Sequence, residues 1–182
     1  MIPDFDHNYV LPPHLGDATD SVAISPYRGT ILEFAEKLVG STERRKIATG
    51  LLQFRKRLVE AGAKGYQWVG GSFVEDIEKT QFRPPNDMDV VTFLDDLTPQ
   101  SIQKIIRLFP ELLNATVIYE NYHVHNFIVR LDWDGQTIVE ETHYRSQLFS
   151  HTRNGIWKGM IRLELGTLAE DANALQFLNK LA

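Results

Sequence analysis

The chain contains no cysteine among its 182 residues. This absence excludes disulfide bonds, thiolate zinc sites and a thiol nucleophile, so any metal ion must be held by oxygen or imidazole ligands. No apolar run reaches the roughly 20 residues that are needed to span a bilayer. The first residues, Met1 to Asp6, lack the basic and apolar regions of a signal peptide. Together these absences predict a cytoplasmic protein with no membrane partner.

Positive charge is scarce, because 19 Lys and Arg stand against 24 Asp and Glu and give a net charge of −5. This balance argues against broad binding to a nucleic-acid backbone, so nucleic acid is expected as a partner only in the role of an acceptor. Basic residues do gather at positions 44–46 and 55–57. We interpret these two groups as the solvated face of a helix.

The length and a hydrophobic content of 43% fit one domain that covers residues 1–182. Residues 1–27 hold four prolines and are expected to form an extended arm whose apolar side chains lie against the body. Two helices are predicted next by apolar spacing, the first at residues 31–38 and the second between Ser41 and Gly62.

The rest of the chain alternates between strand and helix patterns. Alternation, β-branched residues and turn signals predict strands at residues 66–69, 87–94 and 122–133, and a hairpin at Asn154-Gly155 leads into a strand within 156–165. Apolar periodicity predicts helical segments at residues 73–78, 98–114 and 167–181, the last with a capping box of Thr167 and Glu170. This order predicts an α+β fold, with helices packed on a mixed α/β sheet.

Two short motifs carry the candidate chemistry. The turn Gly70-Gly71-Ser72 permits close backbone approach, and the amides that open the next helix can bind an anion while Ser72 donates to a phosphate oxygen. Asp87 and Asp89 are two residues apart on a predicted strand, so both project to one face while Met88 faces the core. Paired carboxylates suit Mg²⁺ or Mn²⁺, and a nucleoside triphosphate would complete such a site.

The segments Val69-Gly70-Gly71-Ser72-Phe73 and Asp87-Met88-Asp89-Val90-Val91 resemble the motifs of the nucleotidyltransferase superfamily. That superfamily includes DNA polymerase beta, the minimal nucleotidyltransferases of toxin–antitoxin systems and bacterial cyclic-oligonucleotide synthases. The resemblance is to an uncharacterised bacterial branch and covers roughly residues 64–165. It implies a mixed sheet flanked by helices, two divalent metal ions, and transfer of a nucleoside monophosphate from a triphosphate to a hydroxyl of a protein, RNA or small molecule.

Members of this superfamily usually carry a third carboxylate on a later strand, beside the aspartate pair. Here the aligned residue is His125, which could ligate a divalent ion or act as a base. Asp132 lies seven residues farther on and would join the metal ligands only if the strand bulged. His123 is expected to share a face with His125, and Lys158 on the last strand could offset the charge of the triphosphate.

The candidate site therefore has three groups of residues. Catalytic roles are expected for Asp87, Asp89 and His125, nucleotide binding for Gly70, Gly71, Ser72 and Lys158, and metal binding for Asp87, Asp89 and Asp132. Loss of the third acid leaves an alternative open, a catalytically degenerate fold that acts as an antitoxin-like or regulatory subunit and binds a protein partner. A nucleic-acid-binding structural module is a third hypothesis, which the acidic charge disfavours.

Overall fold

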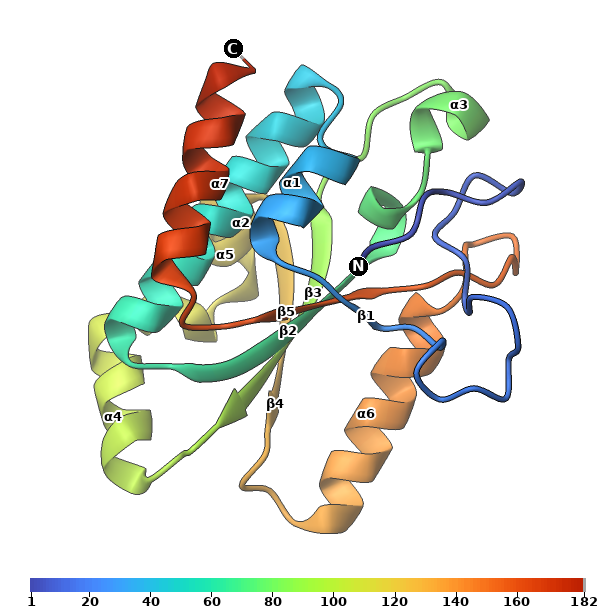
Figure 1. The fold of residues 1–182 in the computed structure, drawn as a ribbon. Coiled ribbons are helices and arrows are strands. Elements are labelled where there is room, and N and C mark those ends of the chain that lie inside the picture. The colour runs from blue at the N-terminus through green and yellow to red at the C-terminus, as the bar shows by residue number, and fades with distance from the viewer. Residues whose placement is uncertain (182) are drawn as a thin grey trace.

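A computed structural model, which describes residues 1–181, confirms an α+β fold with helices on a mixed five-stranded sheet (Figure 1). The strands are β1 (Tyr27–Arg28), β2 (Lys64–Gly70), β3 (Met88–Asp95), β4 (Val124–Arg130) and β5 (Ile161–Glu164). They lie in the order β1-β5-β2-β3-β4. Strand β2 runs antiparallel to both β3 and β5, whereas β3 and β4 are parallel, as are β1 and β5.

The helices begin with the predicted pair, which precedes the central strands. The α-helices are α1 (Ile31–Leu38), α2 (Thr42–Ala61), α3 (Ile77–Gln81), α4 (Pro99–Leu108), α5 (Ala115–Tyr122), α6 (Gly135–Phe149) and α7 (Leu168–Lys180), and η1 (Gly71–Val74) and η2 (Pro110–Leu113) are 3₁₀ turns. Gly62 ends α2 in the left-handed conformation expected of a C-terminal glycine. Among residues 1–181, none of the helices has the length and apolar character that crossing a membrane requires.

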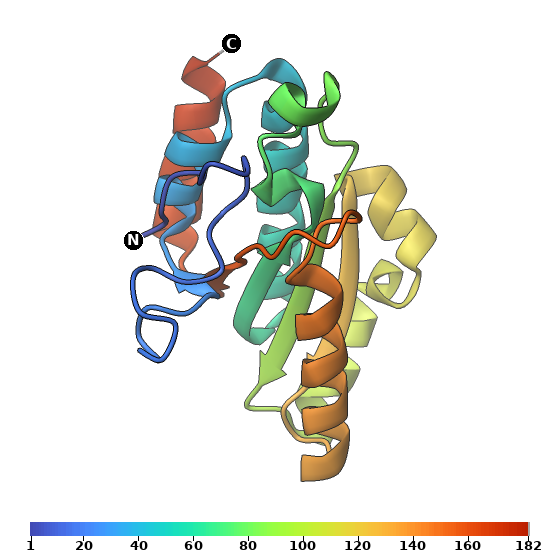
Figure 2. The same ribbon diagram turned by 90° about the vertical axis from the view of Figure 1, so that its right-hand side faces the viewer.

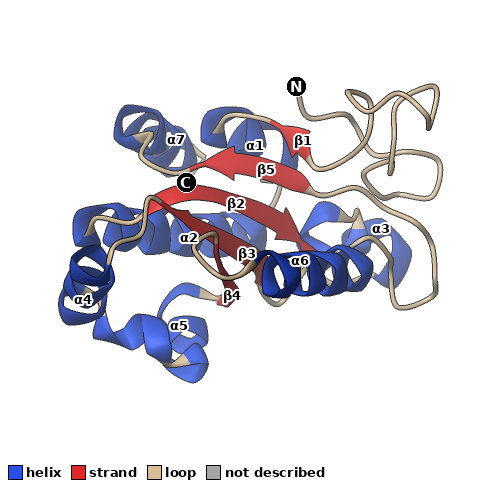
Figure 3. Ribbon diagram, turned by 90° about the horizontal axis from the view of Figure 1, so that it is seen from below, coloured by secondary structure: helices blue, strands red, loops and turns tan. Residues whose placement is uncertain are grey.

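The two faces of the sheet are covered unequally. Helices α1, α2 and α7 pack together on one face, where the larger hydrophobic cluster includes Phe34, Leu51 and Leu178 (Figures 1 and 2). Helix α6 lies on the other face over a smaller cluster that includes Phe93 and Phe149 (Figure 3). Side chains alternate between these clusters along β3, as the pleat of a strand requires.

Two helices were absent from the expected element order. Helix α5 occupies the start of the predicted strand at residues 122–133, and β4 begins only at Val124. Helix α6 follows Asp134, which was expected to form a turn with Gly135. Instead, the Asp134 carboxylate accepts a hydrogen bond from the amide of Thr137 at 3.0 Å and caps the helix.

Three other boundaries also differ from expectation. The helix predicted at residues 98–114 divides at Pro110, which cannot continue the hydrogen-bond ladder of α4. The turn predicted at Asn154-Gly155 is present, but its hairpin is reduced to one antiparallel bridge between His151 and Trp157. The strand that follows within 156–165, β5, pairs with β2 and β1 instead. The Thr167 cap forms no side-chain bond to the helix backbone.

The N-terminal arm lies against the body, as expected, and Ile2 and Leu11 are fully buried. The Leu11 amide donates to the carbonyl of Val74 at 3.2 Å, and its carbonyl accepts from the amide of Gly159 at 2.7 Å. The arm thus joins η1 to the segment before β5. Its last residue, Tyr27, is part of β1, so the arm ends inside the sheet.

The basic groups of α2 are not simply a solvated face, which corrects the prediction. Arg44 is buried and donates to Glu78, and Arg55 is buried and donates to both carboxylate oxygens of Asp171 on α7. Arg55 also donates to Gln67 at 3.0 Å. Buried arginines require such partners, so α2 packs against the sheet and α7 through charge as well as apolar contact.

Candidate functional site

Three adjacent strands bring the two sequence motifs together at one end of the sheet. In the strand register Gly70 of β2 is opposite Asp89 of β3, and Asp89 is opposite His125 of β4. Asp87 lies just before β3, and its Oδ2 is 3.3 Å from Nε2 of His125. Met88 is fully buried, as predicted. The structure thereby confirms that His125 occupies the position next to the aspartate pair.

The glycine turn fits directly around Asp89. Gly71 has a φ of +69°, a conformation that side chains rarely adopt, and a Cβ at this position would lie 2.1 Å from Oδ2 of Asp89. Gly70 performs a similar role toward α6, because its own added Cβ would lie 3.0 Å from Cβ of Phe149. The two glycines therefore let an acid and an aromatic side chain approach the backbone of the turn.

Replacing Gly71 with alanine should destabilise the protein by about 2–4 kcal/mol, through the positive φ and the collision with Asp89. Urea unfolding would measure this loss. Gly40→Ala is the matched control, because no atom lies within 4 Å of its added Cβ and its φ is not positive. Equal unfolding free energies for the two variants would contradict the steric account of the turn.

The carboxylate of Asp89 is in an unfavourable electrostatic environment. Burial raises the pKa of Asp89 above its ordinary value of 3.8, and the negative charge of Asp87 raises it further. The nearby cationic groups Lys158 and Arg153 and an electrostatic contribution from His125 oppose this shift in the pKa of Asp89 without cancelling it. The protein alone therefore does not compensate the two acids, as expected of a site that binds a cation.

This raised pKa gives a prediction for stability without metal ions. Because the folded-state pKa exceeds the unfolded one, Asp89 contributes favourably below pH 3.8, and that contribution is lost as the pH rises through the folded-state value. Asp89→Asn should therefore melt about 2–4 °C above the wild type at pH 7 in the presence of a chelator. The difference should shrink toward pH 4. A variant that melts below the wild type at pH 7 would refute this account of Asp89.

A cavity of about 600 Å³ opens beside the two motifs. Ser72, Asp87 and Asp89 line one part of it, and Phe127 and Phe149 line another. Two arginines, Arg83 and Arg153, also contribute to its wall. A volume of this size suits a small-molecule ligand, and the mixture of acids, cations and aromatic rings suits one that has both a charged and a flat apolar part.

Lys158 lies in the wall of the cavity and is 2% exposed. Its ammonium donates to the carbonyl of Gly71 at 2.7 Å and forms an ion pair with the carboxylate of Glu75. Burial lowers the pKa of Lys158, whereas the charges of Glu75 and Asp89 act in the opposite direction. Lys158 therefore positions the glycine turn, and its predicted contact with phosphate stays a prediction.

Two predicted neighbours are not part of this arrangement. Asp132 lies beyond the far end of β4 and accepts hydrogen bonds from Arg130 at 2.9 and 2.6 Å, so the bulge that would bring it to the metal site does not form. His123 does not share a face with His125, because it ends α5 with a φ of +54° and turns toward α2. The cause is the extent of β4, which begins after His123 and ends before Asp132.

The donor atoms that could hold a divalent ion are the carboxylates of Asp87 and Asp89, with His125 beside them. Within the part of the chain that the structure describes, no group of three or more acidic or histidine side chains is arranged as a metal site. Two carboxylates are nevertheless a suitable protein contribution for Mg²⁺, which commonly takes its other ligands from water and from the phosphates of a substrate. The unfavourable charge on Asp89 fits the same interpretation.

Several residues of the site had no signal in the sequence. Arg83 and Arg153 are isolated basic residues in loops, and Phe149 ends a helix that was not predicted. Tyr119 of α5 contacts His125, with ring centroids 4.7 Å apart. Only the tertiary fold brings these positions to the two motifs.

The chain was compared with curated proteins and with profiles of protein families. No curated protein matches the chain. Residues 3–164 match the profile described as a family of unknown function, DUF6932. This range contains nearly all of the arm, the five strands that the structure describes, the glycine turn, the aspartate pair and His125. It leaves out the first two residues and the chain after residue 164, which includes α7. The chain therefore belongs to the DUF6932 family of unknown function.

Proposed function

We propose that this protein is a metal-dependent nucleotidyltransferase, which transfers a nucleoside monophosphate from a triphosphate to an acceptor hydroxyl. The observation that supports this most is the register of Gly70, Asp89 and His125 across three strands, beside one cavity. Shared geometry alone does not establish an activity, so the proposal rests on the chemistry of these side chains. A chain without cysteine suits the reducing cytoplasm, where we place the reaction.

The charged part of the cavity would receive the triphosphate. The backbone of the Gly70-Gly71-Ser72 turn and the hydroxyl of Ser72 supply donors for phosphate oxygens. Arg83 and Arg153 line the same cavity and would offset the remaining negative charge. Phe127 and Phe149 form a 5.7 Å ring pair in its wall, where a nucleobase could pack.

The acceptor hydroxyl would approach from the side of Asp87 and His125. Its oxygen forms a bond to the α-phosphorus, the bond from that phosphorus to the bridging oxygen breaks, and pyrophosphate leaves. His125, whose Nε2 lies 3.3 Å from the Asp87 carboxylate, is placed to accept the proton of the hydroxyl. The carboxylate of Asp87 would then stabilise the resulting imidazolium.

Asp87 and Asp89 would hold the divalent ion, Mg²⁺ or Mn²⁺. When bound, such an ion supplies neutralisation of the phosphate charge and polarises the phosphorus–oxygen bonds. Gly71 keeps Asp89 against the turn, so the acid and the phosphate-binding backbone are held at a fixed separation. In the other role open to it, as a metal ligand in place of a third acid and not as the base, His125 would favour Mn²⁺, which accepts imidazole ligands better than Mg²⁺ does.

The proposal is tested by incubating the purified protein with each α-labelled nucleoside triphosphate and either Mg²⁺ or Mn²⁺. Release of pyrophosphate together with label on an acceptor is expected, and a chelator should stop both. Acceptors would be supplied as the protein itself, total RNA and a pool of small metabolites. No label transfer with any triphosphate or acceptor would count against the enzyme.

The position of His125 also favours a second function, in which the fold is catalytically degenerate and serves as an antitoxin-like or regulatory subunit. A histidine beside Asp89 is a weaker ligand for Mg²⁺ than a carboxylate, so chemistry could be lost while the scaffold remains. This alternative predicts a stable protein partner in cells. Co-purification of a stoichiometric partner, together with no turnover in the assay above, would support it over the enzyme.

A further inference from the structure

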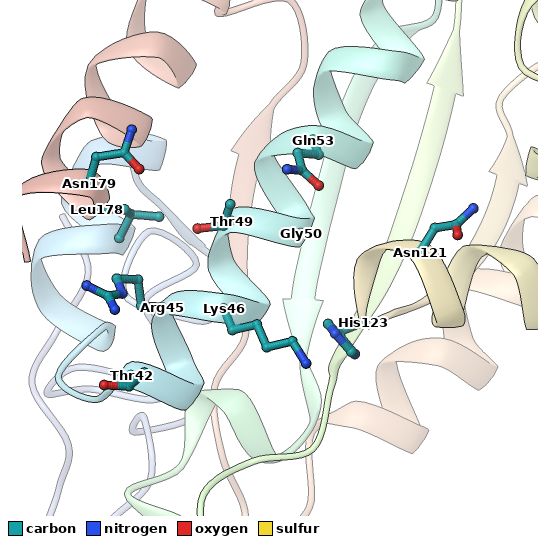
Figure 4. Close-up of a pocket in the computed structure, with 10 residues that line it drawn as sticks. All are labelled: Thr42, Arg45, Lys46, Thr49, Gly50, Gln53, Asn121, His123, Leu178 and Asn179. Carbon is teal, nitrogen blue, oxygen red and sulfur yellow. The ribbon is translucent and has the colours of Figure 1, made fainter. Parts of the chain in front are cut away.

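A second cavity lies on the opposite face of the sheet, over α2 and between α5 and α7. Its volume is about 580 Å³. We name it the α2 groove, and Figure 4 shows the residues that line it. The polar stripe of α2 forms the floor, and the ends of α5 and α7 contribute the sides. Its polar and charged lining includes Arg45, Lys46, Thr49, Gln53, Asn121 and His123.

The α2 groove is cationic although the whole chain carries a charge of −5. None of the described residues that line it is an acid, whereas Arg45 and Lys46 are basic side chains. The other polar groups of the groove, such as Thr49, Gln53 and Asn121, are neutral hydrogen-bonding side chains. A concave surface with two cations and several neutral donors is complementary to a phosphate group.

The guanidinium of Arg45 provides an independent sign that a partner is missing. Its Nη1 is buried and has no hydrogen-bond partner among the residues that the structure describes. A buried donor without a partner costs free energy, and structures rarely leave one unsatisfied. Arg45 lies at the α7 end of the groove, away from Lys46 (Figure 4), and adds positive charge to that end.

The groove also leads to the candidate site. Lys46 and His123 point toward each other at its α5 end (Figure 4). The ring of His123 lies 6.3 Å from that of Tyr119, which lies 4.7 Å from the ring of His125. His125 in turn contacts Asp87. A row of rings thus runs from the cationic groove around the start of β4 to the aspartate pair.

We propose that the α2 groove binds a phosphate group of the acceptor, so that the acceptor is a nucleotide or the end of an oligonucleotide. Its phosphate lies at Lys46, at the α5 end of the groove (Figure 4), and its hydroxyl reaches His125 and Asp87 along the row of rings. This inference rests on the proposed nucleotidyl transfer. It names the class of acceptor, which the triphosphate cavity does not define.

The first test measures binding without divalent ions, using adenosine, adenosine monophosphate and a short RNA with a terminal phosphate as probes. The phosphorylated probes should bind at least about tenfold more tightly than adenosine, and Lys46→Gln should remove about one unit from the slope of log affinity against log salt. Lys56→Gln is the matched control, because Lys56 is an exposed lysine on α2 outside the groove. Equal effects of the two variants would overturn the proposal. Tighter binding of RNA than of the monophosphate would identify an oligonucleotide end.

The second test separates this inference from the proposed function itself. With Mn²⁺, Lys46→Gln should raise the KM for the acceptor at least about tenfold relative to the wild type, while the KM for the triphosphate stays unchanged. Turnover with an unchanged acceptor KM would overturn the groove and leave the enzyme standing. Binding of the phosphorylated probes that depends on Lys46, without any turnover, would overturn the transfer reaction. The acceptor role of the α2 groove would be overturned with it, although the groove would still be a phosphate-binding site.

Discussion

Replacing Asp87 and Asp89 together with asparagine is expected to lower triphosphate turnover at least about a thousandfold. Asparagine preserves the shape of each side chain but removes both charges that would hold a divalent ion. The effect should be similar in Mg²⁺ and Mn²⁺, because neither ion would retain a carboxylate ligand from the pair. Label transfer to the acceptor under saturating triphosphate is the measurement.

The control for this loss is the exposed pair Asp95 and Asp96, which lies at the other end of β3. The same two asparagine substitutions there should leave turnover within about twofold of the wild type. Thermal melting in the presence of a chelator distinguishes loss of chemistry from loss of folding, since removal of charge at Asp89 should not lower the melting temperature. Full activity of the Asp87→Asn, Asp89→Asn variant would exclude the proposed mechanism.

Lys158→Met is expected to lower the free energy of unfolding by about 3–5 kcal/mol. Methionine keeps much of the apolar stem but leaves the carboxylate of Glu75 buried without a counter-charge, since Lys158 and Glu75 are 2% and 8% exposed. The substitution also removes the hydrogen bond to the carbonyl of Gly71. This is a large part of the roughly 5–15 kcal/mol that stabilises a typical domain.

Two further variants test the cause of this loss. Glu75→Gln combined with Lys158→Met should recover a substantial part of the stability, because neither position then carries a buried charge without its partner. Lys79→Met removes an ion pair with Asp76 and a cation–π contact with Tyr9, both made by a lysine that is 66% exposed, and should change stability by less than about 1 kcal/mol. Urea unfolding of the three variants measures both effects. A double variant no more stable than Lys158→Met would show that the ion pair is not the cause.

The sequence was most informative where local chemistry and periodicity agreed. The glycine turn, the aspartate pair and helix α2 all have residue types that few other local structures favour, and the structure places them near the predicted positions. Helices α5 and α6 were missed because their apolar residues do not form a strong stripe, and α6 buries only Phe149 fully. Their stability comes from contacts with β4 and α2, which no local pattern contains.

The candidate site was predicted only in part for a similar reason. Asp87 and Asp89 could be placed on one face from the strand pattern, whereas His125 was aligned through the resemblance to the nucleotidyltransferase superfamily. The structure then gives the register that sets His125 opposite Asp89. The role of Lys158 depends on Glu75, which is 83 residues away in the chain. The buried state of Arg55 likewise depends on Asp171, 116 residues away. Pairings at such separations are set by the packing of elements and leave no periodic trace in the sequence.

The ion pair between Arg55 and Asp171 joins the last helix to the part of the chain that the family profile matches. The family profile ends at residue 164, yet Asp171 on α7 supplies the counter-charge of an arginine inside the matched region. Arg55 is also bonded to Gln67, which donates to Thr92, whose hydroxyl donates to Asn126. A relative that replaced α7 with another element would need to change Arg55 at the same time. The end of the profile match at residue 164 is therefore not a boundary in the packing of this protein.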